Sequence, residues 1–560
     1  MKILDENYFD LIMNNVLLPL YDIDGSITDA DSVTYINERH SVIHLPATDN
    51  ICALGSMPYH IFPSLYEATS PISMRASGIQ TLQDNPYLDL RGQGVLVGVI
   101  DTGIDYTHPA FRNPDNSTRL VSIWDQTEQS GSPPKDFTFG TEYKAETINK
   151  ALSSETPESV VPISDSGGHG TSVASIIAGS PSITANFSGV VPKAELVIVK
   201  LKEAKRNIKN IFCVPNDVIC YMESDIMLGV SYVYSVAQSL QRPVVICIAL
   251  GSSQGGHDGH GALSSYLDSL SQLPWTGVSI SAGNKGIAGR HYFGTAGTAP
   301  FQDDVELLAG AGDTEFALEI WSSYSRLSIE ILAPNHESTQ QIFPSILDCR
   351  RLQFIFHECE IWINNIIFEQ ETGDQLILIR FKKMLPGIWT IRIRNLENEA
   401  FSFHAWLPAG SMLTNNTYFL KSDPDTTITS PGNSYHSLTV TAYDQRVGKI
   451  IQASGRGYTR NGHIKPDLAA PGYRVPCALP QNRYGNTTGS GAASAFAAGA
   501  IAMILEWSVA RGNYTSITGN DINRLLTRGA RHNQDIFYPN NVWGFGELEV
   551  NKVFEQLAMF

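Results

Sequence analysis

Charge and cysteine are both scarce in this sequence. Charged residues make up 17% of the 560 positions, and the formal net charge is −17. This acidic balance argues against a nucleic acid or an anionic membrane as partner, because both bind basic surfaces. The N-terminus places acidic residues before any apolar run, which makes a poor secretory signal, and the apolar run 16–20 is far too short to span a bilayer. We therefore expect a protein made in the cytoplasm without a signal peptide and without a membrane span.

The seven cysteines are irregularly spaced, and no CxxC pair occurs. These absences argue against a zinc site. Cys349 and Cys359 are near enough in sequence to pair, but we expect reduced, buried thiols. No contiguous Asp-rich loop has the pattern of a calcium motif. We predict no cofactor and no metal at the site, and calcium binding elsewhere stays open.

Apolar runs and helical stretches alternate in two parts of the chain. Hydrophobic residues make up 42% of the sequence, enough for more than one sizeable core. The runs 95–100, 196–199 and 244–250 have the pattern of strands buried on both faces, and the stretch 224–240 has helical character. Strands that alternate with helices predict an α/β class with a parallel sheet flanked by helices.

From about residue 302 to 425 the sequence changes to short β-rich runs separated by turns. We expect strands at 327–331, 354–356, 375–379 and 389–393. Alternating polar and apolar residues predict an antiparallel sandwich or barrel in this region. The α/β style returns after about residue 430. We divide the chain into an N-terminal block 1–85 with a strand at 41–45, a core part 86–305, a β insert 306–428 and a second core part 429–560.

An aspartate and a histidine stand in settings that suit acid–base chemistry. Asp101 follows the first buried run, where open α/β sheets place their sites, and could hold a histidine in one tautomer. Taken alone, an Asp that caps the next turn explains it equally well. His169 stands in Gly167-Gly168-His169-Gly170-Thr171 at the start of a predicted helix, where it would act as a general base. The alternative is a loop histidine in a Gly-rich turn.

Asn284 and the segment 488–495 complete the set of candidate site residues. Asn284 stands in Ser-Ala-Gly-Asn, where its amide would donate to an oxyanion; the alternative is a turn residue. The segment Thr488–Ala495 has the spacing of the Gly-Thr-Ser-x-Ala stretch that opens the active-site helix of subtilisin-like serine proteases. The serine of that stretch falls on Gly491.

Together these motifs resemble the subtilisin-like serine proteases, or subtilases, over about residues 90–305 and 430–560. The resemblance implies the subtilisin-like fold and the triad roles of Asp101 and His169. It also implies that Asn284 belongs to the oxyanion hole. By the same resemblance, the residues that line the substrate cleft are Ala249, Leu250 and Gly251.

A narrower resemblance is to the clostridial Csp subtilases of spore germination. It rests on the N-terminal block, the long insert, the segment 250–259 and the Trp-Gly-Phe-Gly tail at 543–546. It implies that the block is a prodomain, that the insert is a jelly roll and that the protein is packaged in the spore. Active members of the group cleave the zymogen of a cortex-degrading hydrolase. Degenerate members of the CspC type regulate germination or help to sense germinants.

Glycine at position 491 removes the oxygen that acyl transfer requires. In subtilisin, loss of the nucleophile costs roughly 2 × 10⁶ in kcat. Ser490 lies one residue early, so its side chain is turned away by ~100° on a helix. Ser494 lies about one turn deeper, where we expect it to bond to an upstream carbonyl. We therefore predict a pseudoprotease with a degenerate triad, in which the remaining Asp and His mainly hold the fold.

Three further expectations follow from the missing nucleophile and the Csp resemblance. The prodomain stays uncleaved, and its tail occupies the cleft. The partners are related Csp proteases or a small-molecule germinant. The alternatives are an active endopeptidase that uses Ser490 to process a cortex hydrolase zymogen, and a purely structural coat component.

Overall fold

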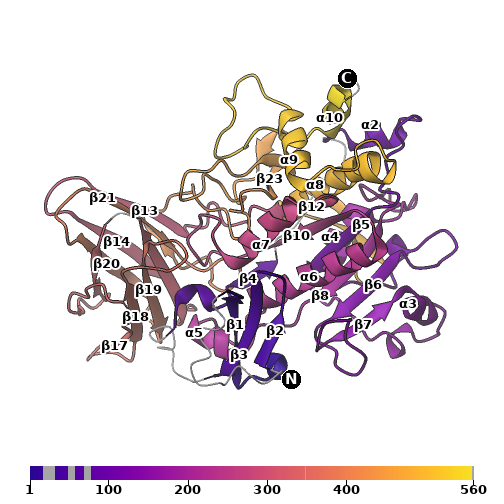
Figure 1. The fold of residues 1–560 in the computed structure, drawn as a ribbon. Helices are drawn as coiled ribbons and strands as arrows, with labels where there is room; N and C mark the ends of the chain where they lie inside the picture. The colour runs from indigo at the N-terminus through magenta and orange to yellow at the C-terminus, as the bar shows by residue number, and fades with distance from the viewer. Residues whose placement is uncertain (17–31, 48–56, 69–76, 324, 347, 558–560) are drawn as a thin grey trace.

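The computed structural model describes residues 1–16, 32–47, 57–68, 77–323, 325–346 and 348–557. Figure 1 shows a small N-terminal block at the bottom, an α/β core on the right and a pair of antiparallel sheets on the left. The predicted α/β class, with a mostly parallel sheet flanked by helices, is confirmed.

The core is built around one nine-stranded sheet. Its strands in spatial order are β24 (Lys449–Ile450), β23 (Leu438–Asp444), β12 (Thr276–Ser281), β10 (Val244–Ile248), β5 (Leu96–Asp101), β8 (Glu195–Lys200), β6 (Leu120–Asp125) and β7 (Thr141–Lys144), and β25 (Leu468–Pro471) pairs with β23. The strands from β23 to β6 run parallel, whereas β24 and β7 are antiparallel to their neighbours. The continuous apolar runs of the sequence are therefore the central parallel strands, as predicted.

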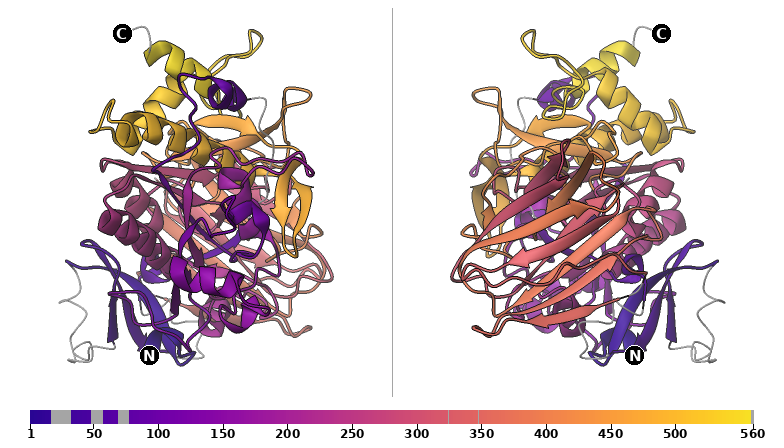
Figure 2. Two further views of the ribbon diagram at one scale, coloured as in Figure 1. Left: turned by 90° about the vertical axis from the view of Figure 1, so that its right-hand side faces the viewer. Right: turned by 90° about the vertical axis from the view of Figure 1, so that its left-hand side faces the viewer.

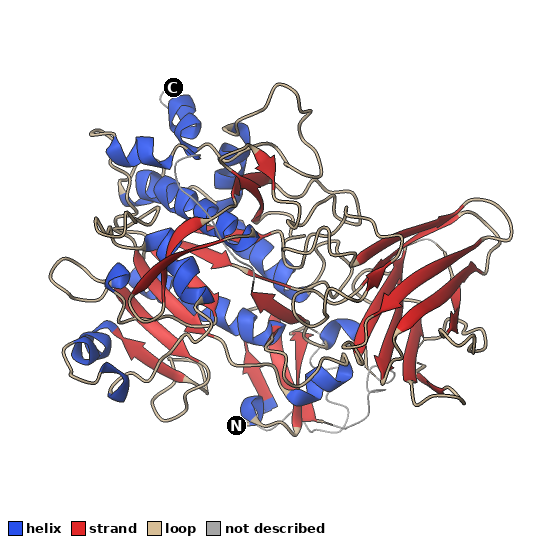
Figure 3. Cartoon of the chain, turned by 180° about the vertical axis from the view of Figure 1, so that it is seen from behind, coloured by secondary structure: helices blue, strands red, loops and turns tan. Residues whose placement is uncertain are grey.

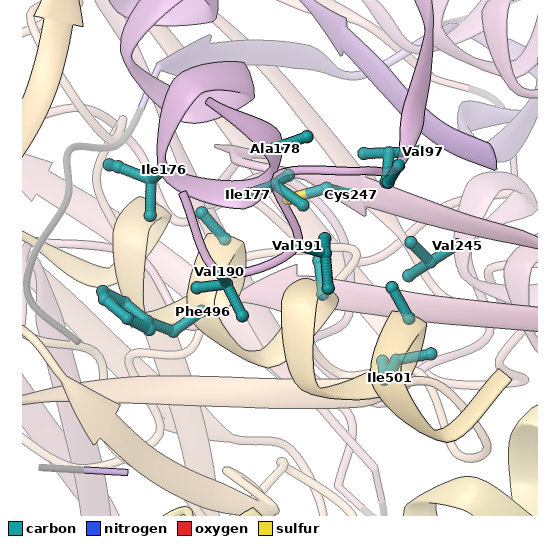
Figure 4. Close-up of a cluster of buried hydrophobic side chains, with 14 of the residues drawn as sticks. Val97, Ile176, Ile177, Ala178, Val190, Val191, Val245, Cys247, Phe496 and Ile501 are labelled. Carbon is teal, nitrogen blue, oxygen red and sulfur yellow. The ribbon is translucent and has the colours of Figure 1, made fainter. Parts of the chain in front are cut away.

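Helices cover both faces of this sheet. Figure 3 shows this arrangement from the side opposite to that of Figure 1. The helices on one face are α4 (His169–Ala178) and α8 (Ser490–Leu505), and those on the other are α6 (Glu223–Leu240) and α7 (Ala262–Ser271). Successive strand residues point to opposite faces. In β5, Val97 packs with α4 and α8, whereas Leu96 packs with α6 and α7. Figure 4 shows Val97 and Cys247 of the sheet beside α4 and α8.

The helix α8 lies at the centre of the core. All of its residues are buried. The stretch Ser490–Ala510 is long and apolar enough to cross a membrane by length and composition, but 89% of its apolar window is buried inside the protein. Burial inside the protein explains the apolar composition of α8. We therefore interpret α8 as a core helix.

The remaining elements of the core are short. They are α2 (Ile79–Asp84), η6 (Pro109–Phe111), α3 (Ala145–Leu152), η7 (Pro157–Ser159), α5 (Arg206–Ile211), β9 (Tyr221–Met222), β11 (Leu250–Gly251), β26 (Val475–Leu479), β27 (Arg483–Thr487), the π-helix η8 (Glu506–Ala510), α9 (Gly519–Arg528) and α10 (Val550–Leu557).

The N-terminal block forms a three-stranded antiparallel sheet that packs against the core. Its elements are η1 (Lys2–Leu4), β1 (Tyr8–Asn14), β2 (Val33–Tyr35), β3 (His40–Pro46), η4 (Tyr59–Ile61) and β4 (Leu65–Ala68), and the sheet order is β1-β3-β2. The strand expected at 41–45 is confirmed as β3. Asp10 of β1 is fully buried, and its Oδ1 lies 2.6 Å from Nδ1 of His44 and 2.9 Å from Nζ of the core residue Lys205. A buried ion pair thus joins the block to the core.

The β insert, residues 291–419, consists of two antiparallel sheets around one apolar core. The first sheet has the order β13 (His291–Ala296), β21 (Phe401–Trp406), β15 (Phe316–Ser322), β19 (Gln375–Lys382), β18 (Glu360–Ile366) and β17 (Arg350–Gln353). The second has the order β16 (Leu327–Leu332), β20 (Gly387–Asn395), β14 (Gln302–Ala309) and β22 (Tyr418–Phe419). The right-hand view of Figure 2 shows the strands of the insert from the side that faces away from the core.

Two details of the insert differ from the sequence expectations. The strands β13 and β14 begin before residue 306, so the sheets start earlier along the chain. The strand expected at 354–356 is wrong, because the chain bends there after β17. The backbone N–H groups of Ile355 and Phe356 donate to the carboxylate of Glu337 instead of a neighbouring strand, and both side chains are exposed.

The cysteines only partly meet the expectation of reduced thiols. Cys213, Cys220, Cys247, Cys359 and Cys477 are free and buried. Cys349 is disulfide-bonded, and its partner is not Cys359, which is free. Cys52 lies outside the described residues. The prediction that every thiol is reduced is therefore wrong at Cys349.

Candidate active-site cleft

Asp101 and His169 form a buried pair at the carboxyl edge of the parallel sheet. Asp101 ends β5, and His169 is the first residue of α4. Oδ1 of Asp101 lies 2.7 Å from Nδ1 of His169, and the Asp101 side chain is fully buried. A carboxylate in this position favours the tautomer with a proton on Nδ1 and leaves Nε2 as the basic nitrogen. The fold thus brings together the two residues that the sequence analysis paired.

Asp165 fixes the start of α4, although the sequence analysis did not single it out. Its Oδ1 accepts from the Thr102 hydroxyl at 2.7 Å and from the backbone N–H of Gly168 at 3.0 Å. Its Oδ2 accepts from the backbone N–H of Thr171 at 2.8 Å and from the hydroxyl at 2.6 Å. An acidic residue just before a helix that starts with small residues is a capping signal in the sequence.

Gly170 lets α4 approach the end of β5 closely. A Cβ atom at this position would lie 2.2 Å from the carbonyl oxygen of Gly103, closer than real Cβ atoms come to other heavy atoms. Because any larger residue would push α4 away from the strand, Gly170 helps to keep His169 within reach of Asp101.

The first turn of α8 contains two serines around Gly491, and neither has the position of a nucleophile in the family pattern. Gly489 precedes the helix with φ 146°, a conformation that favours glycine. The Ser494 hydroxyl donates to the carbonyl of Gly491 at 2.6 Å, as expected. The Ser490 hydroxyl is buried and has no hydrogen-bond partner among the residues that the structure describes. Gly491 itself offers no side-chain oxygen.

Asn284 lies at the same helix start. Its Oδ1 accepts from the backbone N–H of Ser490 at 2.9 Å, which ties the loop after β12 to the first turn of α8. The amide oxygen is therefore engaged by the helix, and the side-chain NH₂ group remains as the donor that an oxyanion would need. This arrangement suits the role that the resemblance implied for Asn284.

A strand of the N-terminal block lies between two short strands of the core. The order in this small sheet is β11-β4-β9, and β4 is antiparallel to both neighbours. Ala68 is opposite Leu250, and Leu65 is opposite Met222. The predicted cleft strand therefore contains Leu250 and Gly251, with the buried Ala249 directly before it.

The packing behind this strand requires a small residue at position 251. A Cβ atom on Gly251 would lie 2.3 Å from Oγ1 of Thr429. The backbone of β11 thus lies directly against Thr429, at the start of the second core part. In the part of the chain that the structure describes, no group of three or more His, Cys, Asp or Glu side chains is arranged to hold a metal ion.

With this geometry in place, the sequence comparison identifies the class: the chain belongs to the subtilase family. The family pattern, peptidase S8, matches residues 92–343 and 413–546, which is more than half of the chain. Within the family, the chain is a subtilisin-like protein of the Csp group. Its structure is similar to that of the Clostridium perfringens CspB protease, with a TM-score of 0.77 and 28% sequence identity over 86% of this chain and 97% of that one.

More distant relatives match parts of the chain. The subtilisin-like protease SBT2.2 of Arabidopsis thaliana is 32% identical over 126 residues, which cover 20% of this chain and 15% of the plant protein. The C5a peptidase of Streptococcus pyogenes is 21% identical over 477 residues, which cover 78% of this chain and 37% of the streptococcal protein. The chain thus spans well under half the length of these relatives.

Proposed function

We propose that this chain is a catalytically inactive subtilase that regulates spore germination, either by sensing a small germinant or by binding related Csp proteases. The observation that carries the proposal is the glycine at position 491, in the first turn of α8. A subtilase needs a hydroxyl there that His169 can deprotonate.

The size of the expected loss argues against residual peptidase function. A factor of roughly 2 × 10⁶ in kcat corresponds to ~8–9 kcal/mol of transition-state stabilisation. The oxyanion hole and substrate binding would still give ~10³–10⁴ over water. Against an amide bond, this remainder is too small for a useful protease.

The position of β4 supports an uncleaved prodomain whose tail closes the cleft. The strand fills the space between β11 and β9, where an extended substrate would pair. Because the chain lacks the serine for self-cleavage, no reaction releases this segment. The germination role, and packaging in the spore, follow from the likeness to the Csp group.

Restoring the serine tests the proposal. The variant Gly491→Ser should cut its own N-terminal block near residue 85, whereas the unchanged chain keeps the 61.3 kDa mass of its sequence. Gly491→Ala is the matched control, because it adds a Cβ without an oxygen. Trimming of the unchanged chain or of the alanine variant, read by intact mass and N-terminal sequencing, would contradict an inactive site.

One observation favours a second candidate, an active endopeptidase that uses Ser490. The Ser490 hydroxyl lacks a hydrogen-bond partner among the described residues and lies at the helix start that Asn284 contacts. Hydrolysis of a zymogen-derived peptide by the unchanged protein, lost on Ser490→Ala, would establish this function. A structural coat component is the third candidate, and pull-down from spore extract combined with ligand-dependent melting shifts separates it from a sensor.

A further inference from the structure

A cavity of about 240 Å³ lies where the N-terminal block, the core and the β insert meet. Its walls come from residues 59–66 of the block, residues 254–265 of the core, and Trp321 with residues 369–372 of the insert. A single water needs only ~10–15 Å³ of such space. The cavity is thus large enough for a small molecule, and its occupant would touch all three parts of the chain.

Two buried polar atoms on this wall lack hydrogen-bond partners. They are Nδ1 of His60 and Oε1 of Glu369. The two atoms lie 3.3 Å apart and form an ion-pair contact with each other, but no aligned hydrogen bond from a described residue reaches either atom. Glu369 is only 3% exposed. Because buried polar atoms in native proteins are nearly always paired, these two point to water or a ligand in the cavity.

The environment of Glu369 favours the ionised carboxylate. Its Oε2 accepts from the backbone N–H groups of Glu371 at 3.1 Å and Thr372 at 2.9 Å, and from the Thr372 hydroxyl at 3.0 Å. Burial acts to raise the pKa of Glu369, but these donors and His60 outweigh it and leave the pKa below its usual value. Oε1 of Glu371 lies 3.7 Å from Nε2 of His60. Two carboxylates and one imidazole therefore converge on the same corner.

The other carboxylates on the wall already have partners. Asp258 pairs with Arg460 at 2.6 Å and with His260 at 3.2 Å. Glu223 accepts from the backbone N–H groups of Ser64 at 3.1 Å and Leu263 at 3.0 Å. Glu369 and Glu371 differ from them in that the charged or basic side chain nearest to both is the His60 ring.

The cationic residue types on the wall do not offset this negative corner. Burial lowers the pKa of His40 and of His257 to about 4, so both are neutral at pH 7. His260 faces Asp258, and the exposed Arg39 lines the cavity on the side of His40, whose pKa its charge helps to lower. The corner around Glu369 therefore holds two carboxylates beside the His60 ring.

We propose that this cavity binds a small organic ammonium ion, with its nitrogen beside Glu369, Glu371 and His60. An ammonium group has three donors and no acceptor, which matches a corner built from acceptors. The rings of Tyr59 and Trp321 lie on the same wall with their centroids 5.8 Å apart and give an apolar surface for the substituent of the cation, while the Arg460 guanidinium already lies over the Trp321 ring, 5.5 Å from its centroid. The Tyr59 hydroxyl donates to Glu319 at 2.6 Å, which holds that ring in place.

This site deepens the sensing part of the proposed function, on which its biological meaning rests. An ammonium ion bound there would link η4, just before β4, to the insert and to the loop that leads into α7. Occupancy would therefore stabilise the seating of the N-terminal block, whose tail lies in the cleft.

Binding of n-butylammonium chloride to the full-length protein tests the proposal. Isothermal titration calorimetry and the melting temperature are read at constant ionic strength, with n-butanol and sodium butyrate as probes of the same length without the positive charge. We expect saturable binding and a rise in melting temperature for butylammonium, and neither for butanol or butyrate. Binding of all three alike, or of none, would overturn the proposal and indicate a water-filled cavity.

Substitutions locate the site. Glu369→Gln should weaken butylammonium binding roughly tenfold or more, and Glu371→Gln roughly threefold, because each removes a charge-assisted hydrogen bond. Glu358→Gln is the matched control, because this insert residue is exposed and pairs with Lys383. If Glu369→Gln does not fold, the affinity of Glu371→Gln for butylammonium decides the test. The Glu371 side chain is 47% exposed, so its replacement leaves no buried group unpaired. Unchanged affinity in the folded variants would contradict the site. The test does not involve position 491, so its failure would leave the inactive-subtilase proposal standing.

Discussion

At the scale of single residues, Asp101 and His169 are the two candidate site residues that the structure brings into direct contact. Oδ1 of Asp101 and Nδ1 of His169 lie 2.7 Å apart, while Oδ2 of Asp101 is buried without a hydrogen-bond partner among the described residues. A buried, hydrogen-bonded pair of this kind holds β5 and α4 together whether or not a reaction follows. We therefore interpret the pair as structural in this chain.

A double-mutant cycle tests that interpretation. Asp101→Ala and His169→Ala should each lower the free energy of unfolding, by roughly 1–3 kcal/mol, because each removes the partner of a buried polar group. The double variant should lose less than the sum, by ~0.5–3 kcal/mol, since the two residues are in contact. Urea denaturation measures all three values. Additive losses would show that the pair contributes nothing as a pair.

At the same scale, the sequence predicted Asp101, His169 and Asn284 but not Asp165. The first three stand in motifs with a known order, so the sequence alone could place them. The role of Asp165 depends on Thr102 and Thr171 folding onto it from two separate segments. The orphaned atoms of His60 and Glu369 were invisible for the same reason, because the cavity exists only once three distant parts of the chain meet.

At the scale of elements, the strands β13 and β21 carry stacked histidines where the insert meets the core. Nε2 of His291 lies 2.9 Å from Nδ1 of His404, and both rings stack near Trp406. Nδ1 of His291 lies 3.3 Å from the carbonyl of Asp423. One neutral tautomer of each ring satisfies these contacts, with His404 donating to His291 and His291 donating to Asp423. A proton on Nε2 of His291 would remove the acceptor that His404 uses.

These histidines predict loss of stability in acid. Burial lowers the pKa of His291 to about 3, helped by His257, and that of His404 to about 2, helped by His291 and Arg460. Below the usual pKa of about 6.5 the unfolded chain binds protons that the folded chain does not. The free energy of unfolding should therefore fall between pH 6.5 and pH 4, by up to ~1.4 kcal/mol per pH unit for each ring.

Measurement of urea unfolding at several pH values checks this slope. His404→Gln should flatten it, and the control His336→Gln, at an exposed loop position, should leave it unchanged. An unaltered slope in His404→Gln would assign the acid sensitivity to other groups.

The positions of strands and helices were easier to predict from the sequence than the neighbouring segments with which they pair. The runs 95–100 and 196–199 became β5 and β8, because a strand buried on both faces must be apolar throughout. The run 354–356 is equally apolar, yet the Glu337 carboxylate accepts from the backbone N–H groups of Ile355 and Phe356, and these two side chains stay exposed. The local sequence pattern shows that a segment is apolar. It does not show whether the fold places a neighbouring strand beside that segment to pair with it.

At the scale of the whole molecule, buried charges hold the N-terminal block to the core. The Asp10 carboxylate contacts the ammonium group of Lys205 and the ring of His44. Lys205 also donates to the carbonyls of Lys2 at 3.0 Å and Tyr8 at 3.2 Å. Burial lowers the pKa of Lys205, and Asp10 opposes that shift. Both charges are buried away from water, so each one is stabilised mainly by the opposite charge of its partner.

Removal of one charge should loosen the block selectively. Asp10→Ala leaves the buried Lys205 without its carboxylate, and losing one partner of a buried pair costs about 3–5 kcal/mol. We expect faster hydrogen exchange and faster proteolysis in β1 and β3, with the nine-stranded core sheet protected as before. Asp5→Ala is the control, because this acidic residue of the same block makes its side-chain hydrogen bonds to exposed Asn7. Equal loosening of block and core would contradict a local fastening.

We propose for the whole chain that it combines the fold of a subtilase with the lack of a working nucleophile. Incubation of the freshly purified, unchanged protein with a fluorophosphonate, followed by intact mass spectrometry, tests this most directly. We expect a single species without adduct, and an adduct in Gly491→Ser under the same conditions. An adduct on the unchanged chain, mapped to Ser490 or to another serine of the cleft, would contradict it.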